Sequence, residues 1–469
     1  MRPCGARWSS RRCAWESSQS FQQSPAGAAC SSKSASTPGT VLGRRTARGP
    51  FGAVFATHET PETEVTGLTD LSATTDVTDR PSGAAESGVQ DRIRDYLDRT
   101  APETPCLVVD LAAVRRNYQA LRSALPDARI CYAVKANPAP EVVATLAALG
   151  SSFDVASPGE IDLCLAQGAS PESISYGNTI KKPRDIARAH RLGVRLFVTD
   201  SEADLLNIAE SAPGSQVFCR VLVDNKGSRT PFGRKFGCTP QTAVRLLRRA
   251  AELGLDPYGV SFHIGSQQLD PSAWEHGIRA AREVFDGLAE HGVTPRMVNL
   301  GGGLPASYTE SAPPLGDYAE HIERALDRHF GARRPELLIE PGRQVVGDAG
   351  VLRTEVVLVT ASAGDDRRWV YLDVGRYNGL AETEGEAITY RLRTSRDGDE
   401  CGPVVLAGPT CDGDDVLYQH TRYDLPLTLR GGDRVDLLSA GAYTASYSSV
   451  CFNGIAPLPT HCIDGDELA

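Results

Sequence analysis

The chain has 469 residues, of which 41% are hydrophobic and 23% are charged, and its formal net charge is −10. A hydrophobic fraction of this size can bury a large core, so the composition excludes a chain that is disordered throughout. No window approaches about 18 consecutive apolar residues, which excludes an ordinary membrane-spanning helix. The acidic balance argues against nucleic acid or an anionic membrane as the main partner.

Twelve cysteines are scattered along the chain, and none of them forms a C-x-x-C pair. The spacing shows no zinc-binding or redox motif, so we expect no metal. Free thiols in so long a chain are typical of a reducing compartment, and the cytoplasm is the expected location.

Residues 1–88 differ in composition from the rest of the chain. Residues 1–50 contain eight Lys or Arg and one acidic residue among many serines, and residues 51–88 turn acidic and Thr-rich. Neither stretch shows helical or strand periodicity, so we predict that residues 1–88 form a disordered tail. Residues 1–50 are typical of an organelle transit peptide, so an organelle is the alternative location. They are also compatible with a dispensable tail.

Predicted strands and helices alternate from residue 110 onward. Cys106–Val109 is predicted to be a strand, and Leu111, Val114 and Tyr118 then recur at helical spacing. Eight further strands are predicted to end near Val134, Val155, Tyr176, Val198, Val223, His263, Leu300 and Glu340. Such alternation predicts an α/β fold, a (β/α)8 TIM-like barrel at residues 110–349.

The pattern changes again after Gly350, where short β-rich runs are separated by Gly and Asp turns. This change predicts a mostly β C-terminal domain at residues 350–469. We expect residues 89–109, which precede the barrel, to join that domain.

Reactive residues follow the predicted barrel strands, which is where barrel enzymes place their active sites. Lys135 directly follows the first strand, and a lysine in a barrel mouth can form a Schiff base. Gly301-Gly302-Gly303 follow the seventh strand, where backbone N–H groups commonly bind phosphate. Taken alone, such a lysine is more typical of a surface and such glycines of a plain loop.

Glu340 and Arg343 close the eighth strand, where the carboxylate can pair with a pyridine nitrogen and the guanidinium with phosphate. His263 and Ser266 lie at the end of the sixth strand, and the imidazole can stack on a flat cofactor, although a single histidine there is more often a core residue. Together these residues supply an amine, a ring face, phosphate donors and a partner for a pyridine nitrogen. That combination indicates pyridoxal phosphate.

Six motifs stand in a fixed order: Tyr-Ala-Val-Lys-Ala-Asn (132–137), Phe-His-Ile-Gly-Ser (262–266), Gly-Gly-Gly (301–303), Glu-Pro-Gly-Arg (340–343), Gly-Pro-Thr-Cys-Asp (408–412) and Gly-Ala-Tyr-Thr (441–444). With these motifs, residues 92–462 resemble the ornithine decarboxylase family of pyridoxal-phosphate enzymes, which has the alanine-racemase-like fold. The bacterial ornithine/lysine decarboxylases are the most similar branch.

The resemblance implies a role for each matching residue. Lys135 would form the Schiff base with the cofactor, Glu340 would pair with the pyridine nitrogen, and His263 would stack on the ring. The phosphate would be bound by Ser266, Gly301, Gly302, Gly303, Arg343 and Tyr443. Positions near the cofactor are matched by Asp154, Glu160 and Arg220.

The resemblance also implies a homodimer whose active sites are shared between subunits. Cys411 and Asp412 would enter from the other subunit, where the thiol returns a proton to the substrate α-carbon and the carboxylate binds the distal ammonium. Lys235 and Asp415 match a salt bridge across that interface, although two ordinary surface charges would look the same. Glu386 is the nearest counterpart of a second acidic residue in many eukaryotic relatives, and would bind substrate.

The expected reaction is the decarboxylation of L-ornithine to putrescine, a step of polyamine biosynthesis. L-Lysine, giving cadaverine, is the first alternative, because a longer carboxylate at position 386 changes the reach to the ammonium. Diaminopimelate decarboxylases resemble this chain too but usually carry Cys-Glu in place of Cys411-Asp412, and alanine racemases lack that pair. An inactive regulatory homologue would typically lose Lys135 or the phosphate ligands.

Overall fold

The computed structural model describes residues 84–469 except 232, 362–363, 365 and 466. Residues 1–83 of the predicted tail therefore lie outside the described residues. Residues 84–88 belong to helix α1 (Ala84–Thr100), so the tail ends earlier than predicted. Val89, Ile93 and Leu97, each 1% exposed, form the buried face of this helix, and their spacing of four residues explains why the helix packs.

In the described part of the chain, eight parallel strands form a closed barrel: β2 (Ala128–Ala133), β3 (Ser152–Val155), β4 (Ile174–Tyr176), β5 (Leu196–Thr199), β6 (Gln216–Arg220), β8 (Asp256–Ser261), β10 (Met297–Asn299) and β11 (Glu336–Ile339). Seven of the predicted strand ends are correct to within two residues. β6 ends three residues before the predicted Val223. The (β/α)8 prediction is confirmed.

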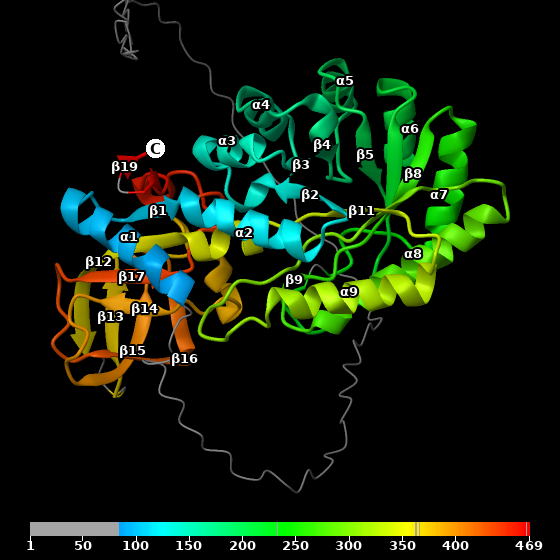
Figure 1. Cartoon of the computed structure of the whole chain (residues 1–469). Coiled ribbons are helices and arrows are strands. Elements are labelled where there is room, and N and C mark those ends of the chain that lie inside the picture. Colours follow the sequence, from blue (N-terminus) through cyan, green and yellow to red (C-terminus); the bar gives the residue numbers. More distant parts are fainter. Residues whose placement is uncertain (1–83, 232, 362–363, 365, 466) are drawn as a thin grey trace, which may run out of the picture. The chain divides into compact units, whose positions relative to one another are not determined.

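Helices alternate with these strands and surround the barrel (Figure 1). They are α2 (Leu111–Ala124), α3 (Pro140–Ala148), α4 (Pro158–Ala166), α5 (Pro183–Arg191), α6 (Glu202–Ser211), α7 (Pro240–Glu252), α8 (Trp274–Ala289), α9 (Leu315–Phe330) and the short α10 (Arg343–Val346). Four of them, α3, α4, α5 and α7, begin with proline, whose fixed φ suits the first turn of a helix.

The barrel interior has its own packed cluster, contributed by six of the strands: Cys131, Leu196, Val198, Phe218, Tyr258, Met297 and Leu338. Each of these side chains is nearly or fully buried. Because side chains fill the interior of such barrels, ligands bind at the carboxyl ends of the strands.

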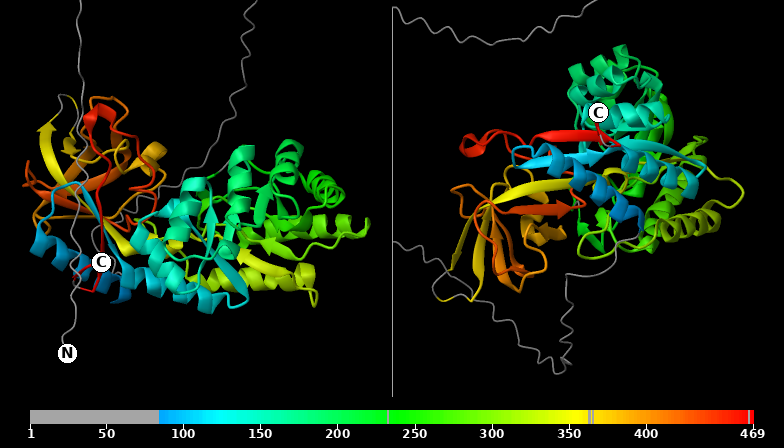
Figure 2. Two further views of the ribbon diagram at one scale, coloured as in Figure 1. Left: turned by 90° about the horizontal axis from the view of Figure 1, so that it is seen from above. Right: turned by 60° about the vertical axis from the view of Figure 1, so that its left-hand side comes forward.

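The second part of the described chain is a mostly β domain. Its strands are β12 (Gly350–Ala361), β13 (Arg368–Leu372), β14 (Leu392–Thr394), β15 (Cys401–Ala407), β16 (Val416–Pro426), β17 (Arg434–Leu438), β18 (Thr460–Asp464) and β19 (Glu467–Leu468). Strand β1 (Cys106–Asp110) lies in the same sheet, antiparallel to β12 and parallel to β18. Figure 2 shows this N-terminal strand beside the strands of the C-terminal domain.

None of the helices found in residues 84–469, apart from the gaps given above, is both long enough and apolar enough to cross a membrane.

Replacing Asp110 with alanine should destabilise the protein by about 2–4 kcal/mol. Asp110 is fully buried, accepts a hydrogen bond from the Ala112 amide at 2.8 Å as the N-cap of α2, and binds Arg92 Nε at 2.8 Å. The loss would be measured by urea denaturation. As a control, Asp91→Ala removes an exposed carboxylate paired only with Arg94 and should cost at most about 0.5 kcal/mol. Equal losses would contradict the buried role of Asp110.

Candidate active site

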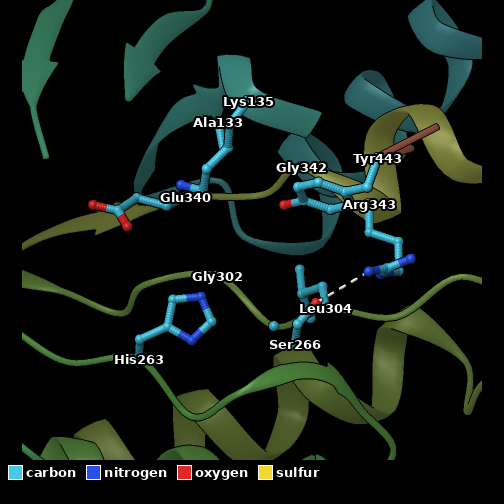
Figure 3. Close-up of a pocket in the computed structure, with 11 residues that line it drawn as sticks. Ala133, Lys135, His263, Ser266, Gly302, Leu304, Glu340, Gly342, Arg343 and Tyr443 are labelled. Carbon is cyan, nitrogen blue, oxygen red and sulfur yellow. Dashed lines mark hydrogen bonds between the residues drawn. The ribbon is translucent and has the colours of Figure 1, made fainter. Parts of the chain in front are cut away.

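A pocket of about 370 Å³, a volume that includes open solvent, lies at the carboxyl ends of the barrel strands (Figure 3). Its lining includes eight of the predicted site residues: Lys135, His263, Ser266, Gly302, Gly303, Glu340, Arg343 and Tyr443. Figure 3 shows that the amine, the carboxylate and the imidazole lie toward one end of the pocket, whereas Arg343, Tyr443 and Ser266 lie toward the other. The sequence therefore predicted most of this pocket.

Lys135 lies in a single turn, η1 (Val134–Ala136), directly after β2. Its Nζ is 3.0 Å from Oδ2 of Asp154, a buried residue of β3. Burial lowers the pKa of the lysine, but the charges of Asp154, Tyr443 and Glu340 outweigh it and raise the pKa above its usual value. The side chain is 44% exposed because it faces the open pocket, so the amine is accessible to a ligand.

Glu340 directly follows β11, and Asn299 at the end of β10 donates a hydrogen bond of 2.6 Å to its Oε1. Burial, followed by the negative charge of Asp154, raises the pKa of Glu340 from 4.5 to about 7. A carboxyl group that titrates near neutrality can share a proton with a ring nitrogen.

His263 follows β8 and accepts a hydrogen bond from the Gly265 amide to its Nδ1 at 3.1 Å. Burial lowers its pKa well below the usual value, and the positive charges of Arg220 and Lys135 lower it further. The ring is therefore neutral at neutral pH. A Cβ on Gly302 would lie 3.1 Å from Nε2 of His263, so glycine keeps space beside the ring.

The opposite end of the pocket is built to receive an anion. Arg343, at the start of α10, is 3% exposed, and its Nη2 donates to the hydroxyl of Ser266 at 3.2 Å. Its Nη1 donates to the phenol of Tyr308 at 2.6 Å, and the ring of Tyr443 lies 4.9 Å from the guanidinium carbon. Among the described residues, no atom accepts a hydrogen bond from its buried Nε. A buried cation with donor capacity to spare suits a phosphate.

The three glycines bring backbone close to this end. Gly301 and Gly303 have φ values of +67° and +120°, which side-chain-bearing residues rarely adopt. A Cβ on Gly301 would lie 2.1 Å from the Phe262 carbonyl oxygen, and one on Gly303 would lie 2.6 Å from that of Gly265. Only glycine allows the turn after β10 to pack against the segment that carries His263 and Ser266.

Some predicted residues lie around the pocket rather than in its lining. Glu160 accepts the Ala156 amide at 2.6 Å through its carboxylate, and Arg220 packs against Phe236 at the end of β6. Arg220 and the pocket carboxylates interact electrostatically, since Glu340 and Asp154 partly offset the lowering of the Arg220 pKa by burial.

Cys411 and Asp412 do not line the pocket of this subunit. They lie on the loop between β15 and β16, where the Cys411 thiol is exposed and accepts a hydrogen bond from Asn453 Nδ2 at 3.1 Å. The structure thus separates the predicted proton donor from the predicted cofactor-binding residues of the same chain.

The carboxylate of Glu386 binds the β sheet in this chain, and its expected role in substrate binding stays a prediction. It ends the segment η5 (Ala381–Glu386), and its carboxylate accepts the backbone amides of three residues of β16: Gln419, His420 and Thr421. These bonds fix η5 on the sheet, and Glu386 is absent from the pocket lining. Sequence alone suggested the acidic character of the segment but not which carboxylate faces which way.

The expected salt bridge between Lys235 and Asp415 across a subunit interface stays a prediction. Within its own chain Asp415 is 2% exposed and is already bound by several donors. Its carboxylate accepts the Arg376 amide at 2.8 Å, and the Thr410 amide and hydroxyl at 3.0 and 2.7 Å. Asp415 therefore organises the loop that carries Cys411 and Asp412.

Three residues near the pocket were missed by sequence reasoning. Asn299 ends a barrel strand directly before the glycines, so the rule used for the other residues could have found it. Tyr308 and Glu382, which both bind Arg343, lie outside the strand ends, and no spacing in the sequence points to them.

Comparison with known proteins identifies the family. Residues 111–347 match the family model described as "Pyridoxal-dependent decarboxylase, pyridoxal binding domain". The chain belongs to the pyridoxal-phosphate-dependent ornithine/arginine decarboxylase family. It is therefore an amino-acid carboxy-lyase, and the predicted family and cofactor are confirmed.

Its relatives match along most of their length. The lysine/ornithine decarboxylase of Selenomonas ruminantium is 36% identical over 360 residues, which are 76% of this chain and 89% of that protein. The structure of a Vibrio vulnificus lysine/ornithine decarboxylase with cadaverine has a TM-score of 0.72 at 31% identity, covering 80% of this chain and 98% of that one. The arginine decarboxylase of Paramecium bursaria Chlorella virus has a TM-score of 0.73 at 28% identity, with coverages of 80% and 100%.

The residues of the pocket fit pyridoxal phosphate. An accessible amine and a neutral imidazole lie at one end, and a buried guanidinium with an unused N–H lies at the other. The carboxyl group of Glu340 is held by Asn299 and can face a pyridine nitrogen. Aldehyde, ring nitrogen and phosphate of the cofactor thus each have a chemically matched partner.

Without cofactor, Glu340 should make the stability of the protein fall as the pH rises from about 4.5 to 7. A carboxyl group whose pKa is raised by folding binds its proton more tightly in the folded state, so its stabilisation is complete below 4.5 and lost above 7. Glu340→Gln should remove this dependence and make the apoprotein more stable than wild type at pH 8, by up to about 3 kcal/mol.

The measurement is urea denaturation of both apoproteins between pH 4.5 and 8. Glu290→Gln, which changes an exposed carboxylate at the end of α8, should keep the wild-type pH profile. Parallel profiles for wild type and Glu340→Gln would show that Glu340 does not titrate in this range.

Proposed function

We propose that this decarboxylase acts on L-ornithine and releases putrescine and CO2. The observations that support the proposal are a Lys135 pocket that fits the cofactor and, on a loop outside that pocket, an Asp412 carboxylate that directly follows the exposed thiol of Cys411. A carboxylate suits the distal ammonium of a basic amino acid, and an ammonium binds poorly where it finds no counter-charge. Relatives named lysine/ornithine decarboxylases support a basic substrate.

In this proposal Lys135 would hold the cofactor covalently through Nζ, and Arg343, Ser266, the glycine turn and Tyr443 would bind its phosphate. Bound pyridoxal phosphate supplies the electron sink that accepts the electron pair left by the departing carboxylate. Glu340, held by Asn299, would pair with the pyridine nitrogen and keep a proton there. His263 offers the ring a flat neutral face, and Asp154 keeps the Lys135 amine aimed into the pocket.

We further propose that Cys411 and Asp412 complete the active site of a second copy of the chain. The loop that carries them lies in a region with exposed apolar side chains: Tyr447 is 57% exposed, Val450 is 86% exposed and Phe452 is 38% exposed. Such clustering is typical of a surface that another chain covers. The thiol of Cys411 would then deliver the proton to the substrate α-carbon.

L-Lysine is the second candidate substrate, since the named relatives act on lysine as well as ornithine. The binding of Glu386 to β16 favours lysine as the substrate. Glu386 is expected to reach the ammonium of the shorter ornithine, but its carboxylate already accepts backbone amides of β16. The cytoplasmic location, and a targeting role of the N-terminal residues, stay predictions.

The first test is CO2 release by the full chain with pyridoxal phosphate, on L-ornithine, L-lysine, L-arginine and meso-diaminopimelate in parallel. We expect the highest kcat/KM for ornithine and no release by Lys135→Ala, which lacks the amine. A higher kcat/KM for lysine would move the substrate assignment but keep the residue roles. Release from none of the four would overturn the proposed function.

A second test addresses the shared site. Lys135→Ala and Cys411→Ala should each be impaired, the latter by about 10²–10⁴-fold through loss of a positioned proton donor. Dissociating and reassociating an equal mixture should restore about a quarter of wild-type activity, because half of the dimers are mixed and each holds one intact site.

The matched control is a mixture of Lys135→Ala with Arg343→Ala. Both substitutions lie in the same pocket of one chain, so a mixed dimer has no intact site and should not regain activity. In that mixture each mixed dimer has one subunit lacking the amine and the other lacking the guanidinium. If both mixtures regain the same activity, or if neither regains any, the result would argue against a site shared through Cys411.

A further inference from the structure

A carboxylate of the β domain lies directly behind the anion-binding end of the pocket. Glu382, on η5, accepts a hydrogen bond from Arg343 Nη2 at 2.6 Å through its Oε1. The side chains of the two residues are 10% and 2% exposed, so the ion pair is buried. The three amides of β16 that bind Glu386 fix the same segment, which holds Glu382 in place.

The charge of Arg343 is therefore balanced before any ligand binds. Burial lowers the pKa of Arg343, but the charge of Glu382 is the largest opposing effect and raises it well above the usual value. The same Nη2 also donates to Ser266, so the carboxylate and the phosphate ligands share one nitrogen. Within the described residues, Oε2 of Glu382 is buried without a hydrogen-bond partner.

A phosphate that binds Arg343 must share it with this carboxylate. The two groups are both negative and lie in a poorly hydrated environment, where repulsion between like charges is stronger than in water. Glu382 thus has two effects: it holds the guanidinium toward Ser266, and it lowers the attraction of the pocket for any anion. Free phosphate, which has no link to Lys135, loses the most from the second effect.

We propose that Glu382 is a positioning residue that acts through Arg343 to set phosphate affinity, and that it disfavours free phosphate relative to the cofactor. The proposal rests on the assignment of this pocket to pyridoxal phosphate. It concerns the strength of binding and does not depend on which amino acid is decarboxylated.

The test compares apoproteins of the full chain. Glu382→Gln keeps the acceptor on Arg343 and removes the charge, so inorganic phosphate should bind about tenfold more tightly or better. Glu382→Asp keeps the charge on a shorter side chain, and its phosphate affinity should stay at or below that of wild type. Binding is measured by calorimetry and by the shift of Tm with inorganic phosphate.

Pyridoxal phosphate is titrated in parallel into the Lys135→Ala background, where no covalent link forms and phosphate binding is read directly. Adding Glu382→Gln there should tighten binding by a similar factor. Glu384→Gln is the matched control, because this neighbour on η5 is 75% exposed and pairs only with Arg376, so the affinities should not change.

A gain in affinity separates the proposal from a merely structural role, since damage to the pocket would only weaken binding. Unchanged or weaker phosphate binding by Glu382→Gln would overturn the proposal, as would an equal gain in Glu382→Asp. The same gain together with no CO2 release from any substrate would uphold this inference and overturn the proposed function instead. If Glu382→Gln does not fold, a gain in Glu382→Asp alone still contradicts the charge argument.

Discussion

The candidate active site depends on the cation of Lys135, which lies close to the buried carboxylate of Asp154 and interacts with the partly buried carboxylate of Glu340. Lys135 lies 3.0 Å from Asp154 and interacts electrostatically with Glu340, where its positive charge opposes the rise of the Glu340 pKa that burial and Asp154 cause. The site for this cluster is prepared by the backbone: a Cβ at Gly177 would lie 1.8 Å from Oδ1 of Asp154. The cluster forms because parallel strands β2, β3 and β11 are neighbours in the barrel and end at the same edge.

The anion-binding end depends on the β domain as well as on the barrel. Tyr443, which follows β17, has φ = +58°, a strained value for this residue type, and its amide donates to the Ala136 carbonyl at 2.8 Å, next to Lys135. A Cβ on Gly342 would lie 3.1 Å from the Tyr443 hydroxyl, so the glycine makes room for the phenol. Together with Glu382, which approaches Arg343 from η5, these contacts make the cofactor pocket a junction of two domains, in which the barrel alone would be incomplete.

The sequence predicted those parts of the fold and site that follow from a repeated rule. Barrel strands recur at regular intervals and converge, so Lys135, His263, Glu340 and the glycines could be placed together without a structure. Residues whose position depends on a particular turn could not. Glu382 and Glu386 are four residues apart on one short acidic segment, yet the left-handed backbone at Gly385 and Glu386 turns the second toward β16 and leaves the first on Arg343. From the sequence, Asp415 is expected to be a surface charge, because no pattern in the neighbouring residues indicates that three hydrogen-bond donors converge on its carboxylate.

The burial of Asp415 also bears on how the proposed shared site would form. Its carboxylate ties the Cys411 loop to the turn at Arg376, and a Cβ on either Gly375 or Gly408 would lie within 2.3 Å of it, so both turns pack tightly around the charge. The neighbouring segment is fixed independently, because Ser449 donates its amide and hydroxyl to the Tyr377 carbonyl, and Phe452 packs on the Tyr377 ring at 4.8 Å. Thiol and carboxylate are thus presented on an ordered surface in the single chain. A partner that docks there gains both groups with little further loss of conformational entropy, which is the condition under which a site divided between subunits can bind its substrate tightly.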